Sequence, residues 1–409
     1  MLTYEQALRR VRKATPPPRV ARRALHEALG LVLAQRIIAP LDLPPFDNSA
    51  VDGYAIRVAR RPGSQDAGSA NGNGRPIVLR LAGQSSAGSP FCGSVRPDEA
   101  VRVFTGAVVP RGTDRIIMQE HVKRVGSQVI VARVPSAGRH IRRRAEDLRR
   151  GARALDAGTR LRPQEIGLLA AMGYRRVLVY QPPSVAILAT GDELQRPGAR
   201  LTRGRIYESN GALLAALVRR EGARALRLGL VRDVFRRLVA RIRLGLRHDI
   251  LLVAGGVSVG EKDLVRDACK ACGVNEIFWQ VNIKPGMPLF CGRRGRTLVF
   301  GLPGNPVSVF VTFEEFVKPA LFRLMGRSWQ DGYTEPAVLV NDLQVSPTRR
   351  THFLRVRCSS HNQLVAEPLN GQASHQLHSL VKADGWIRVV SGESPWPAGT
   401  QVLVKRETA

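Results

Sequence analysis

In the second half of the chain, short apolar runs alternate with amphipathic segments, and this alternation constrains the fold more than any other feature. The runs at 184–188 and 250–253 have the length and composition of buried strands, and helical patterns follow them. The last of these helices begins at Asn305-Pro306, where proline takes its favoured first position. Strands that alternate with helices form a parallel sheet covered on both faces, so we predict a doubly wound α/β domain over residues 181–327.

The turns that follow these predicted strands are rich in glycine and carboxylate. They are Thr190-Gly191-Asp192-Glu193, Arg232-Asp233, the stretch from Gly255 to Asp263, and the stretch from Leu302 to Ser308. Glycine lets the backbone approach an anion, and helix N-terminal N–H groups are aimed at it. Carboxylates in the same crevice would repel that anion unless a hard divalent cation, for which Mg²⁺ is the best candidate, lies between them. We therefore predict a Mg²⁺-assisted phosphate or pyrophosphate site; ordinary helix capping is the alternative for any one of these residues taken alone.

The standard motifs of other nucleotide-binding and hydrolytic enzymes are absent from the sequence. No GxxxxGK[ST] pattern occurs, which argues against a P-loop NTPase. The run Gly255-Gly256-Val257-Ser258-Val259-Gly260 lacks the spacing of a dinucleotide fingerprint, and no GxSxG elbow is present.

Three further regions flank the predicted α/β domain. Residues 46–139 contain short β-branched runs separated by turn residues and predict a β-rich module. Residues 1–45 together with 140–180 predict a helical and linker region, and residues 328–409 return to short strands and predict a small C-terminal β-barrel. The whole chain is thus expected to be an α/β multidomain protein.

Two helices are predicted near the amino terminus. Thr3 and Gln6 have the spacing of a capping box for a helix that runs to about Lys13. A second short helix is predicted over residues 19–29. The charged residues of the first segment are unlike a signal peptide, which favours a cytoplasmic location.

The net charge of the chain is strongly positive, but it does not indicate nucleic acid. Lys and Arg number 63 against 33 Asp and Glu, which leaves +30, while aromatic residues are only 5% of the chain. The densest basic run, at 142–150, has no aromatic residue that could stack on a base. No apolar run approaches the roughly 20 residues that span a bilayer. We therefore expect neither a nucleic-acid partner nor a membrane, and consider small anions as the remaining targets.

Several motifs taken together resemble one family, the molybdopterin molybdenumtransferases, which are MoeA-type enzymes related to the gephyrin E domain. The matching stretches agree in order and approximate spacing over about residues 4–327, and they are 44–55, 105–114, 141–147, 190–194, 206–210, 255–263, 284–286 and 302–308. Any one of these motifs alone would be a weak signal, whereas eight in order are a strong one. The carboxy-terminal region fits the length of the family but carries little motif evidence.

The resemblance implies a transferase of molybdenum cofactor biosynthesis. Such an enzyme takes adenylylated molybdopterin and molybdate, inserts the metal at the dithiolene sulfurs and releases AMP. Members of the family use Mg²⁺ and form homodimers, with the cleft between the α/β domain of one subunit and the β-rich module of the other. A molybdopterin adenylyltransferase that delivers the substrate is an implied partner.

The resemblance also implies roles for individual residues. Glu193, Asp233 and Asp263 are the candidates for binding Mg²⁺ and for catalysis, and Asp52 and Thr105 would complete the cleft from the other subunit. The residues expected to bind the anionic substrates are Arg142, Asp147, Gly255, Gly256, Ser258, Lys284, Pro303, Gly304, Asn305 and Ser308. A salt bridge to the neighbouring arginines is the alternative for Asp147, and a turn-forming role is the alternative for Asp52.

The chain departs from the family pattern at three places. Gln280 stands where relatives often have lysine, Ala145 replaces a common glycine, and Val253-Ala254 stand where a hydroxyl residue usually precedes the double glycine. Two other functions remain open at this point. One is an adenylyltransferase-like enzyme, which usually consists of the α/β domain alone; the other is a non-catalytic scaffold like gephyrin, which would not need the three carboxylates.

Overall fold

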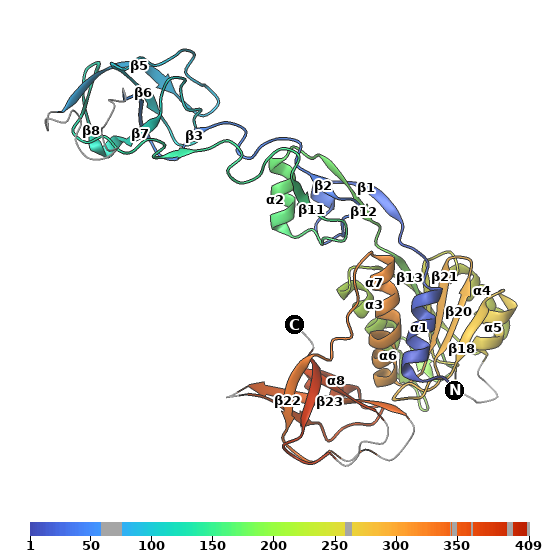
Figure 1. The fold of residues 1–409 in the computed structure, drawn as a ribbon. Helices are drawn as coiled ribbons and strands as arrows, with labels where there is room; N and C mark the ends of the chain where they lie inside the picture. Colours follow the sequence, from blue (N-terminus) through green and yellow to red (C-terminus); the bar gives the residue numbers. More distant parts are fainter. Residues whose placement is uncertain are drawn as a thin grey trace. The chain divides into compact units, whose positions relative to one another are not determined.

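The computed structural model describes residues 1–58, 76–257, 264–343, 345, 350–360, 363–390 and 396–406. The chain forms two compact units (Figure 1). Unit 1 comprises Met1–Ala34, Gly158–Arg162 and Arg176–Ala409, and unit 2 comprises Gln35–Ala157 and Pro163–Arg175.

Unit 1 contains the predicted α/β domain, which is built on a six-stranded sheet. Its strands are β13 (Ser184–Thr190), β16 (Arg224–Val231), β17 (Ile250–Ala254), β18 (Asn275–Trp279), β20 (Phe290–Arg294) and β21 (Thr297–Leu302). The order is β16-β13-β17-β21-β20-β18, and the first four strands are parallel to one another. β20 pairs antiparallel with β21, and β18 pairs antiparallel with β20. The prediction of a doubly wound parallel sheet is therefore confirmed, with an antiparallel extension at one edge.

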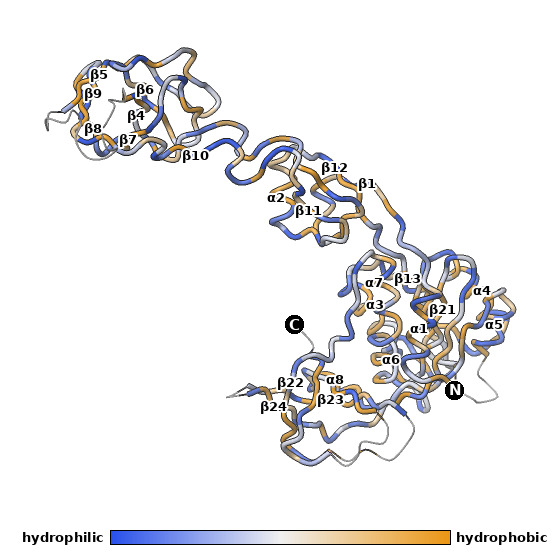
Figure 2. The backbone as a smooth tube through the Cα atoms, viewed as in Figure 1, coloured by the Kyte–Doolittle hydropathy of each residue, from blue (hydrophilic) through white to orange (hydrophobic). Residues whose placement is uncertain are grey.

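Helices cover both faces of this sheet (Figure 1). They are α1 (Tyr4–Ala14), α3 (Asn210–Arg220), α4 (Phe235–Gly245), α5 (Val265–Ala271), α6 (Pro306–Thr312), a π-helical segment (Phe313–Val317) and α7 (Lys318–Leu324). Alternate residues of β13 enter opposite cores: Ile187 packs with α1, α3, α6 and α7, and Leu188 packs with α4 and α5. Hydrophobic residues accordingly run along β13 and β21 (Figure 2). No helix in the described part of the chain has the length and apolar character needed to cross a bilayer.

The amino-terminal helix belongs to the α/β core. The predicted capping box of α1 is present, because Thr3 Oγ1 accepts a hydrogen bond from the N–H of Gln6 and the Gln6 side chain accepts one from the N–H of Thr3. Ala7 and Val11 on its buried face join the core that surrounds β13. Although the sequence analysis grouped residues 1–45 with the linker, this helix packs with residues far along the chain.

The predicted second helix over residues 19–29 is wrong. That segment contains strand β1 (Val20–Ala24), followed by the short 3-10 helix Leu25–Glu27. β1 pairs antiparallel with β12 (Arg176–Tyr180), so a partner about 155 residues away supplies its hydrogen bonds. The local helix-like pattern is overridden by this long-range pairing.

The predicted C-terminal barrel is confirmed. Its five strands are β22 (Glu335–Leu339), β23 (Thr351–Ser360), β24 (Leu364–Pro368), β25 (Gly385–Val389) and β26 (Gln401–Arg406), with helix α8 (Leu377–Lys382) between β24 and β25. The pairing of β23 with β25 closes the barrel. Phe353 and Trp386 extend from it into the core of the α/β domain, where Trp386 stacks on Phe310 with 5.3 Å between ring centroids.

Unit 2 is rich in strands. Its six-stranded sheet has the order β7-β4-β6-β5-β9-β8, with β4 (Gly53–Ile56), β5 (Ile77–Ser85), β6 (Glu99–Val103), β7 (Arg115–Met118), β8 (Val122–Val125) and β9 (Gln128–Val131). The 3-10 helix Gln119–His121 lies between β7 and β8. Two small antiparallel pairs join the linker: β3 (Asn48–Ser49) with β10 (Ile141–Arg142), and β2 (Ile37–Ile38) with β11 (Arg153–Leu155). Helix α2 (Pro163–Ala171) completes unit 2.

Among the described residues, unit 1 has three further short strands, which are β14 (Leu194–Gln195), β15 (Ile206–Tyr207) and β19 (Ile283–Lys284).

Candidate active site

The candidate active site of unit 1 is a cleft of about 1310 Å³ at the carboxyl ends of the parallel strands. The chain runs from β13 to β16 on one side and then to β17 on the other, so the strand order reverses between β13 and β17. Ligands of doubly wound sheets bind at such a switch point. Nine of the site residues predicted from the sequence line this cleft: Glu193, Asp233, Gly255, Gly256, Lys284, Pro303, Gly304, Asn305 and Ser308.

Thr190 joins three of the predicted turns at the end of β13. Its buried hydroxyl donates a hydrogen bond of 2.6 Å to Oδ1 of Asp233, which follows β16. Its carbonyl oxygen faces Gly255, where a Cβ atom would lie 2.3 Å from that oxygen, and Gly255 also has a φ of +94°. Only glycine fits this close approach, so the backbone at the end of β17 lies directly beside the Asp233 carboxylate network.

Asp233 is not a helix cap, contrary to the alternative that we considered for any one of these turns. The N-cap of α4 is Val234, and no side-chain hydrogen bond caps that helix. The Asp233 carboxylate instead points to Thr190, and the backbone N–H of Asp233 donates to Oδ1 of Asp192 at 3.3 Å. The Asp233 side chain therefore lines the cleft and does not cap α4.

The turn between β21 and α6 is held by two asparagine side chains. Nδ2 of Asn210, at the start of α3, donates to the carbonyl oxygen of Gly304 at 2.6 Å. Nδ2 of Asn305 donates to Oγ of Ser374 at 2.9 Å and does not cap α6. Oδ1 of Asn210 is buried and has no hydrogen-bond partner within the described residues, although it belongs to a residue that lines the cleft. An unpaired buried acceptor of this kind is suited to a donor group of a ligand.

The C-terminal barrel contributes a wall of the cleft that the sequence analysis did not predict. Arg350, His352, Ser374 and His375 all line the cleft. They reach it because β19, a loop strand of the α/β domain, pairs with β23 of the barrel, which sets Lys284 opposite His352. Burial lowers the pKa of His352, and the positive charges of Lys284 and Arg350 lower it further. No sequence motif marks these residues, because only the strand pairing brings them to the cleft.

The donor chemistry of the cleft fits Mg²⁺. Carboxylates such as those of Glu193 and Asp233 are the hard oxygen ligands that Mg²⁺ uses, and the ion commonly takes one or two of them together with substrate phosphates and water. The Glu193 carboxylate folds back onto Gly191, where a Cβ atom would meet its Oε1 at 2.7 Å. Among the described residues there is no group of three His, Cys, Asp or Glu that could hold a metal ion by itself. The third predicted ligand, Asp263, and the predicted anion donor Ser258 lie outside those residues.

Asp52 and Thr105 are brought together within unit 2. The Asp52 carboxylate accepts hydrogen bonds from the backbone N–H of Thr105 at 2.7 Å and from its hydroxyl at 2.8 Å. The backbone bond and then the hydroxyl bond lower the pKa of Asp52, so this carboxylate stays ionised to lower pH than usual. Asp52 is therefore more than a local turn-forming residue, because its carboxylate is hydrogen-bonded to Thr105, which follows β6.

Arg142 and Asp147 also belong to unit 2, and both are exposed. The neighbouring arginines pair with other carboxylates: Arg143 with Asp47 at 2.8 Å and Arg144 with Asp42 at 2.5 Å. Asp147 therefore takes no part in the salt bridge that we considered as its alternative role, within the described part of unit 2.

Two of the departures from the family pattern have left-handed backbones. Ala145 has a φ of +61° and Gln280 a φ of +68°. The glycine that is common at position 145 in the family would adopt this conformation without a clash of its Cβ atom. Gln280 does not line the cleft, whereas Ala254 does.

Comparison with known families identifies three matches along the chain. Residues 2–173 match the MoeA N-terminal region (domains I and II), residues 186–323 match a probable molybdopterin binding domain, and residues 338–406 match the MoeA C-terminal region (domain IV). Together the three matches cover nearly the whole chain.

Individual relatives agree with these matches. The chain is 33% identical over 414 residues to a molybdopterin molybdenumtransferase of Haemophilus influenzae, which covers 99% of this chain and 98% of the relative. It is 35% identical over 388 residues to molybdopterin molybdenumtransferase 2 of Mycobacterium tuberculosis, covering 93% of each. The crystal structure of a molybdopterin biosynthesis MoeA protein from Pyrococcus horikoshii superimposes with a TM-score of 0.83 at 28% identity over 99% of both chains.

Proposed function

Because the chain belongs to the molybdopterin molybdenumtransferase family, we propose that it inserts molybdate into adenylylated molybdopterin and releases AMP. The protein is thus a transferase of molybdenum cofactor biosynthesis. The observation that carries the proposal is the cleft at the switch point of the sheet, whose lining includes the carboxylates of Glu193 and Asp233, two consecutive glycines and a lysine. These groups suit a substrate that carries a pyrophosphate and a second substrate that is a dianion.

The pyrophosphate of the first substrate is proposed to bind at the ends of β13, β16 and β17. Gly255 and Gly256 let the backbone approach the phosphate oxygens closely. Glu193 and Asp233 would hold Mg²⁺, with Thr190 orienting the Asp233 carboxylate. Bound Mg²⁺ would neutralise pyrophosphate charge and polarise the phosphorus from which AMP departs.

Molybdate is proposed to bind at the cationic groups of the cleft. Lys284 and Arg350 supply positive charge there, and the hydroxyl groups of Ser308 and Ser374 are available as donors. The lowered pKa of His352 keeps its imidazole neutral near neutral pH, so the cationic charge at this end rests on the lysine and the arginine. The pyrophosphate would thus be held through Mg²⁺ and its carboxylates, whereas molybdate would be held directly by cations and hydroxyl groups.

The direct test is an assay of AMP release with adenylylated molybdopterin, molybdate and Mg²⁺. We expect release of AMP and formation of active cofactor, and loss of both when Mg²⁺ is removed with a chelator and regained when Mg²⁺ is restored. Absence of AMP release with all components present would reject the proposed activity. A parallel assay with molybdopterin and ATP distinguishes the adenylyltransferase reading, for which pyrophosphate would be the product.

We also propose that the enzyme acts as a homodimer in which Asp52 and Thr105 of one subunit complete the cleft of the other. The support is chemical: the Asp52 carboxylate has a lowered pKa and is oriented by Thr105, yet the predicted Mg²⁺ ligands Glu193, Asp233 and Asp263 all belong to the other unit of the chain. A substrate-delivering adenylyltransferase and a cytoplasmic location are parts of the same proposal. The positive net charge would draw anionic substrates to the protein and raise their encounter rate.

Mixing inactive subunits tests the shared cleft. One preparation carries Asp52→Asn and the other Glu193→Gln, and subunits are exchanged by mild denaturation and refolding. If the cleft is shared, each mixed dimer has one intact site, and the mixture is expected to recover about a quarter of the wild-type activity. Recovery should follow the formation of mixed dimers, measured by mass spectrometry. If both separate variants are inactive and the mixed dimers are inactive too, the two residues act within one subunit and the shared cleft is rejected.

The other two readings of the sequence are not favoured. An adenylyltransferase-like enzyme would usually consist of the α/β domain alone, whereas this chain also matches the N-terminal and C-terminal regions of the family. A scaffold would not need Asp233, which does not cap its helix and is oriented into the cleft by Thr190.

A further inference from the structure

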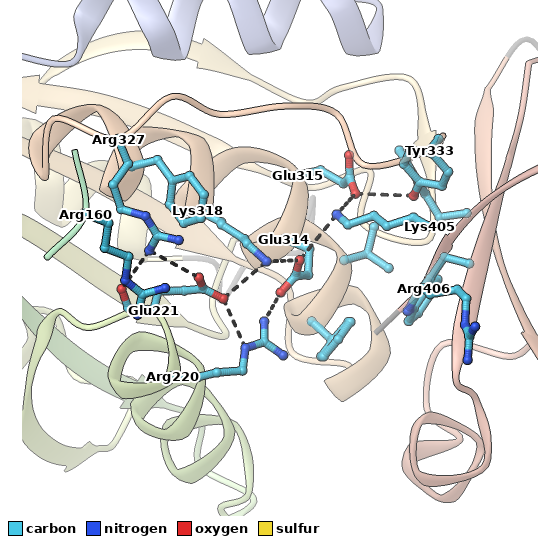
Figure 3. A pocket seen from close by; sticks show the side chains of 15 residues that line it. Arg160, Arg220, Glu221, Glu314, Glu315, Lys318, Arg327, Tyr333, Lys405 and Arg406 are labelled. Carbon is cyan, nitrogen blue, oxygen red and sulfur yellow. Dashed lines mark hydrogen bonds and ion pairs between the residues drawn. The ribbon is translucent and has the colours of Figure 1, made fainter. Parts of the chain in front are cut away.

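A second cavity, of about 440 Å³, lies between the α/β domain and the C-terminal barrel (Figure 3). Its walls come from the end of α3, the helical stretch from α6 to α7, the linker around Arg160 and the strands of the barrel. Of the described residues, only Phe353 lines both this cavity and the candidate cleft. The cavity is therefore separate from the proposed active site.

Positive charges outnumber negative ones in this cavity. Three carboxylates line it, those of Glu221, Glu314 and Glu315. Six cations line it: Arg160, Arg220, Lys318, Arg327, Lys405 and Arg406. Figure 3 shows the carboxylates and most of these cations within one connected network.

The three carboxylates are already paired by groups of the protein. Glu221 lies 3.0 Å from Arg220 and 3.2 Å from Lys318. Glu314 pairs with Lys318 at 3.0 Å and with Lys405 at 3.3 Å. Glu315 accepts hydrogen bonds from Lys405 at 3.0 Å and from two tyrosine hydroxyls, those of Tyr4 and Tyr333. Part of the positive charge of the cavity therefore neutralises all three carboxylates.

Two of the six cations, Arg160 and Arg406, have no ion pair with these three carboxylates, and Arg327 pairs with Glu221 at 3.9 Å, farther than Arg220 and Lys318 do. Arg160 is exposed and has no ion pair with any described carboxylate, and the nearest carboxylate to Arg406 is Glu335 at 3.9 Å. Burial lowers the pKa of Arg327, and the nearby charge of Arg160 lowers it further, although Glu221 opposes both effects. A bound anion would relieve the repulsion between the guanidinium groups of Arg160 and Arg327.

Aromatic side chains form the remaining walls. They are Phe310, Phe322, Tyr333, Phe353 and Trp386. The Arg327 guanidinium lies 3.8 Å from the centroid of Phe322. Five aromatic residues around one cavity are a high local density in a chain of which only 5% is aromatic. The size falls within the roughly 300–1,000 Å³ of small-molecule sites and exceeds what a bare oxyanion needs.

We propose that this cavity binds an organic phosphate of mononucleotide size, with its phosphate beside Arg160 and Arg327, which lie next to each other in Figure 3, and its ring system against the aromatic wall. Arginine is suited to phosphate because its planar fork donates two hydrogen bonds at once. The buried ion pairs around Glu314 would stay intact on binding, since the ligand meets only the cations that they leave over. The site is independent of the transferase reaction and would make the protein responsive to a phosphorylated metabolite.

The test uses AMP as the probe on the full-length protein. Titration calorimetry measures stoichiometry and affinity, and tryptophan fluorescence reports on this cavity, because Trp386 lines it and does not line the cleft. We expect AMP to change the fluorescence of the wild type and not that of Trp386→Phe. AMP bound in the cleft as a reaction product would contribute heat in both proteins without this signal.

Charge removal separates the proposed site from general attraction by a basic protein. Arg160→Gln is expected to weaken the fluorescence-detected binding of AMP about tenfold, as expected for one lost hydrogen bond to a charged group. The matched control is Arg236→Gln, which removes the same charge from an exposed position on α4 outside both cavities and should leave the affinity unchanged. Equal affinity for the two variants would overturn the proposal. So would binding of adenosine as tight as that of AMP, or binding of inorganic phosphate as tight as that of AMP.

Discussion

Replacement of Asp233 by Asn is expected to slow AMP release by about a hundredfold or more, as for the loss of a group that stabilises charge in a transition state. Asparagine has the same shape, and its carbonyl oxygen can still accept the hydrogen bond from Thr190, so the fold around β13 and β16 should be kept. What is lost is the negative charge that would hold Mg²⁺ against the pyrophosphate. Glu193→Gln is expected to act in the same direction.

The measurement is the steady-state rate of AMP release over a range of Mg²⁺ concentrations. We expect the Mg²⁺ concentration needed for half-maximal rate to rise in both variants, whereas a merely structural role would lower stability without changing this dependence. Asp267→Asn is the matched control, because it makes the same change at an exposed position on α5 away from the cleft. A wild-type rate and Mg²⁺ dependence for Asp233→Asn would contradict the metal-binding role.

Replacement of Lys405 by Met is expected to lower the free energy of unfolding by about 3–5 kcal/mol, the usual cost of removing one partner of a buried ion pair. Burial alone would lower the pKa of Lys405, but Glu315 and Glu314 outweigh it and raise that pKa, so the ammonium is firmly charged in the folded protein. Lys405 belongs to the barrel and both glutamates to the helical stretch after α6. Glu315, only 2% exposed, would then lose its cation and keep only tyrosine hydroxyls.

Urea unfolding followed by tryptophan fluorescence measures this loss. The double variant Lys405→Met with Glu315→Gln is expected to recover part of the stability, because the carboxylate that Lys405 leaves behind is then neutral. Lys382→Met, at an exposed position on α8, should change stability by no more than about 0.5 kcal/mol. If Lys405→Met were as stable as this control, the buried network would not hold the barrel to the α/β domain.

The fold of the α/β domain could be predicted because its signals are local. Continuous apolar strands, helix faces and Asn305-Pro306 each act within one element, and the parallel order of β16, β13, β17 and β21 then brings their carboxyl ends to one edge. The same reasoning placed Glu193, Asp233 and the two glycines together, and the structure has them in one cleft.

The prediction of a helix over residues 19–29 was wrong because the structure of that segment depends on a distant part of the chain. Its residues form an acceptable helical pattern in isolation, yet Val20–Ala24 gain their hydrogen bonds from Arg176–Tyr180. The capping alternative for Asp233 was likewise decided outside the local sequence, because Thr190, the donor to its carboxylate, comes from another strand.

By itself, the sequence determined the doubly wound domain, the C-terminal barrel and the family to which the chain belongs, because these depend on periodicity and on motifs that are contiguous in the chain. Only the tertiary structure showed that Arg350, His352 and Ser374 of the barrel form a wall of the cleft, and that Lys405 meets Glu314 and Glu315 in the interior. The physical reason is that these contacts join residues far apart in the chain. Strand pairing and burial bring such residues together, and neither leaves a pattern among sequence neighbours.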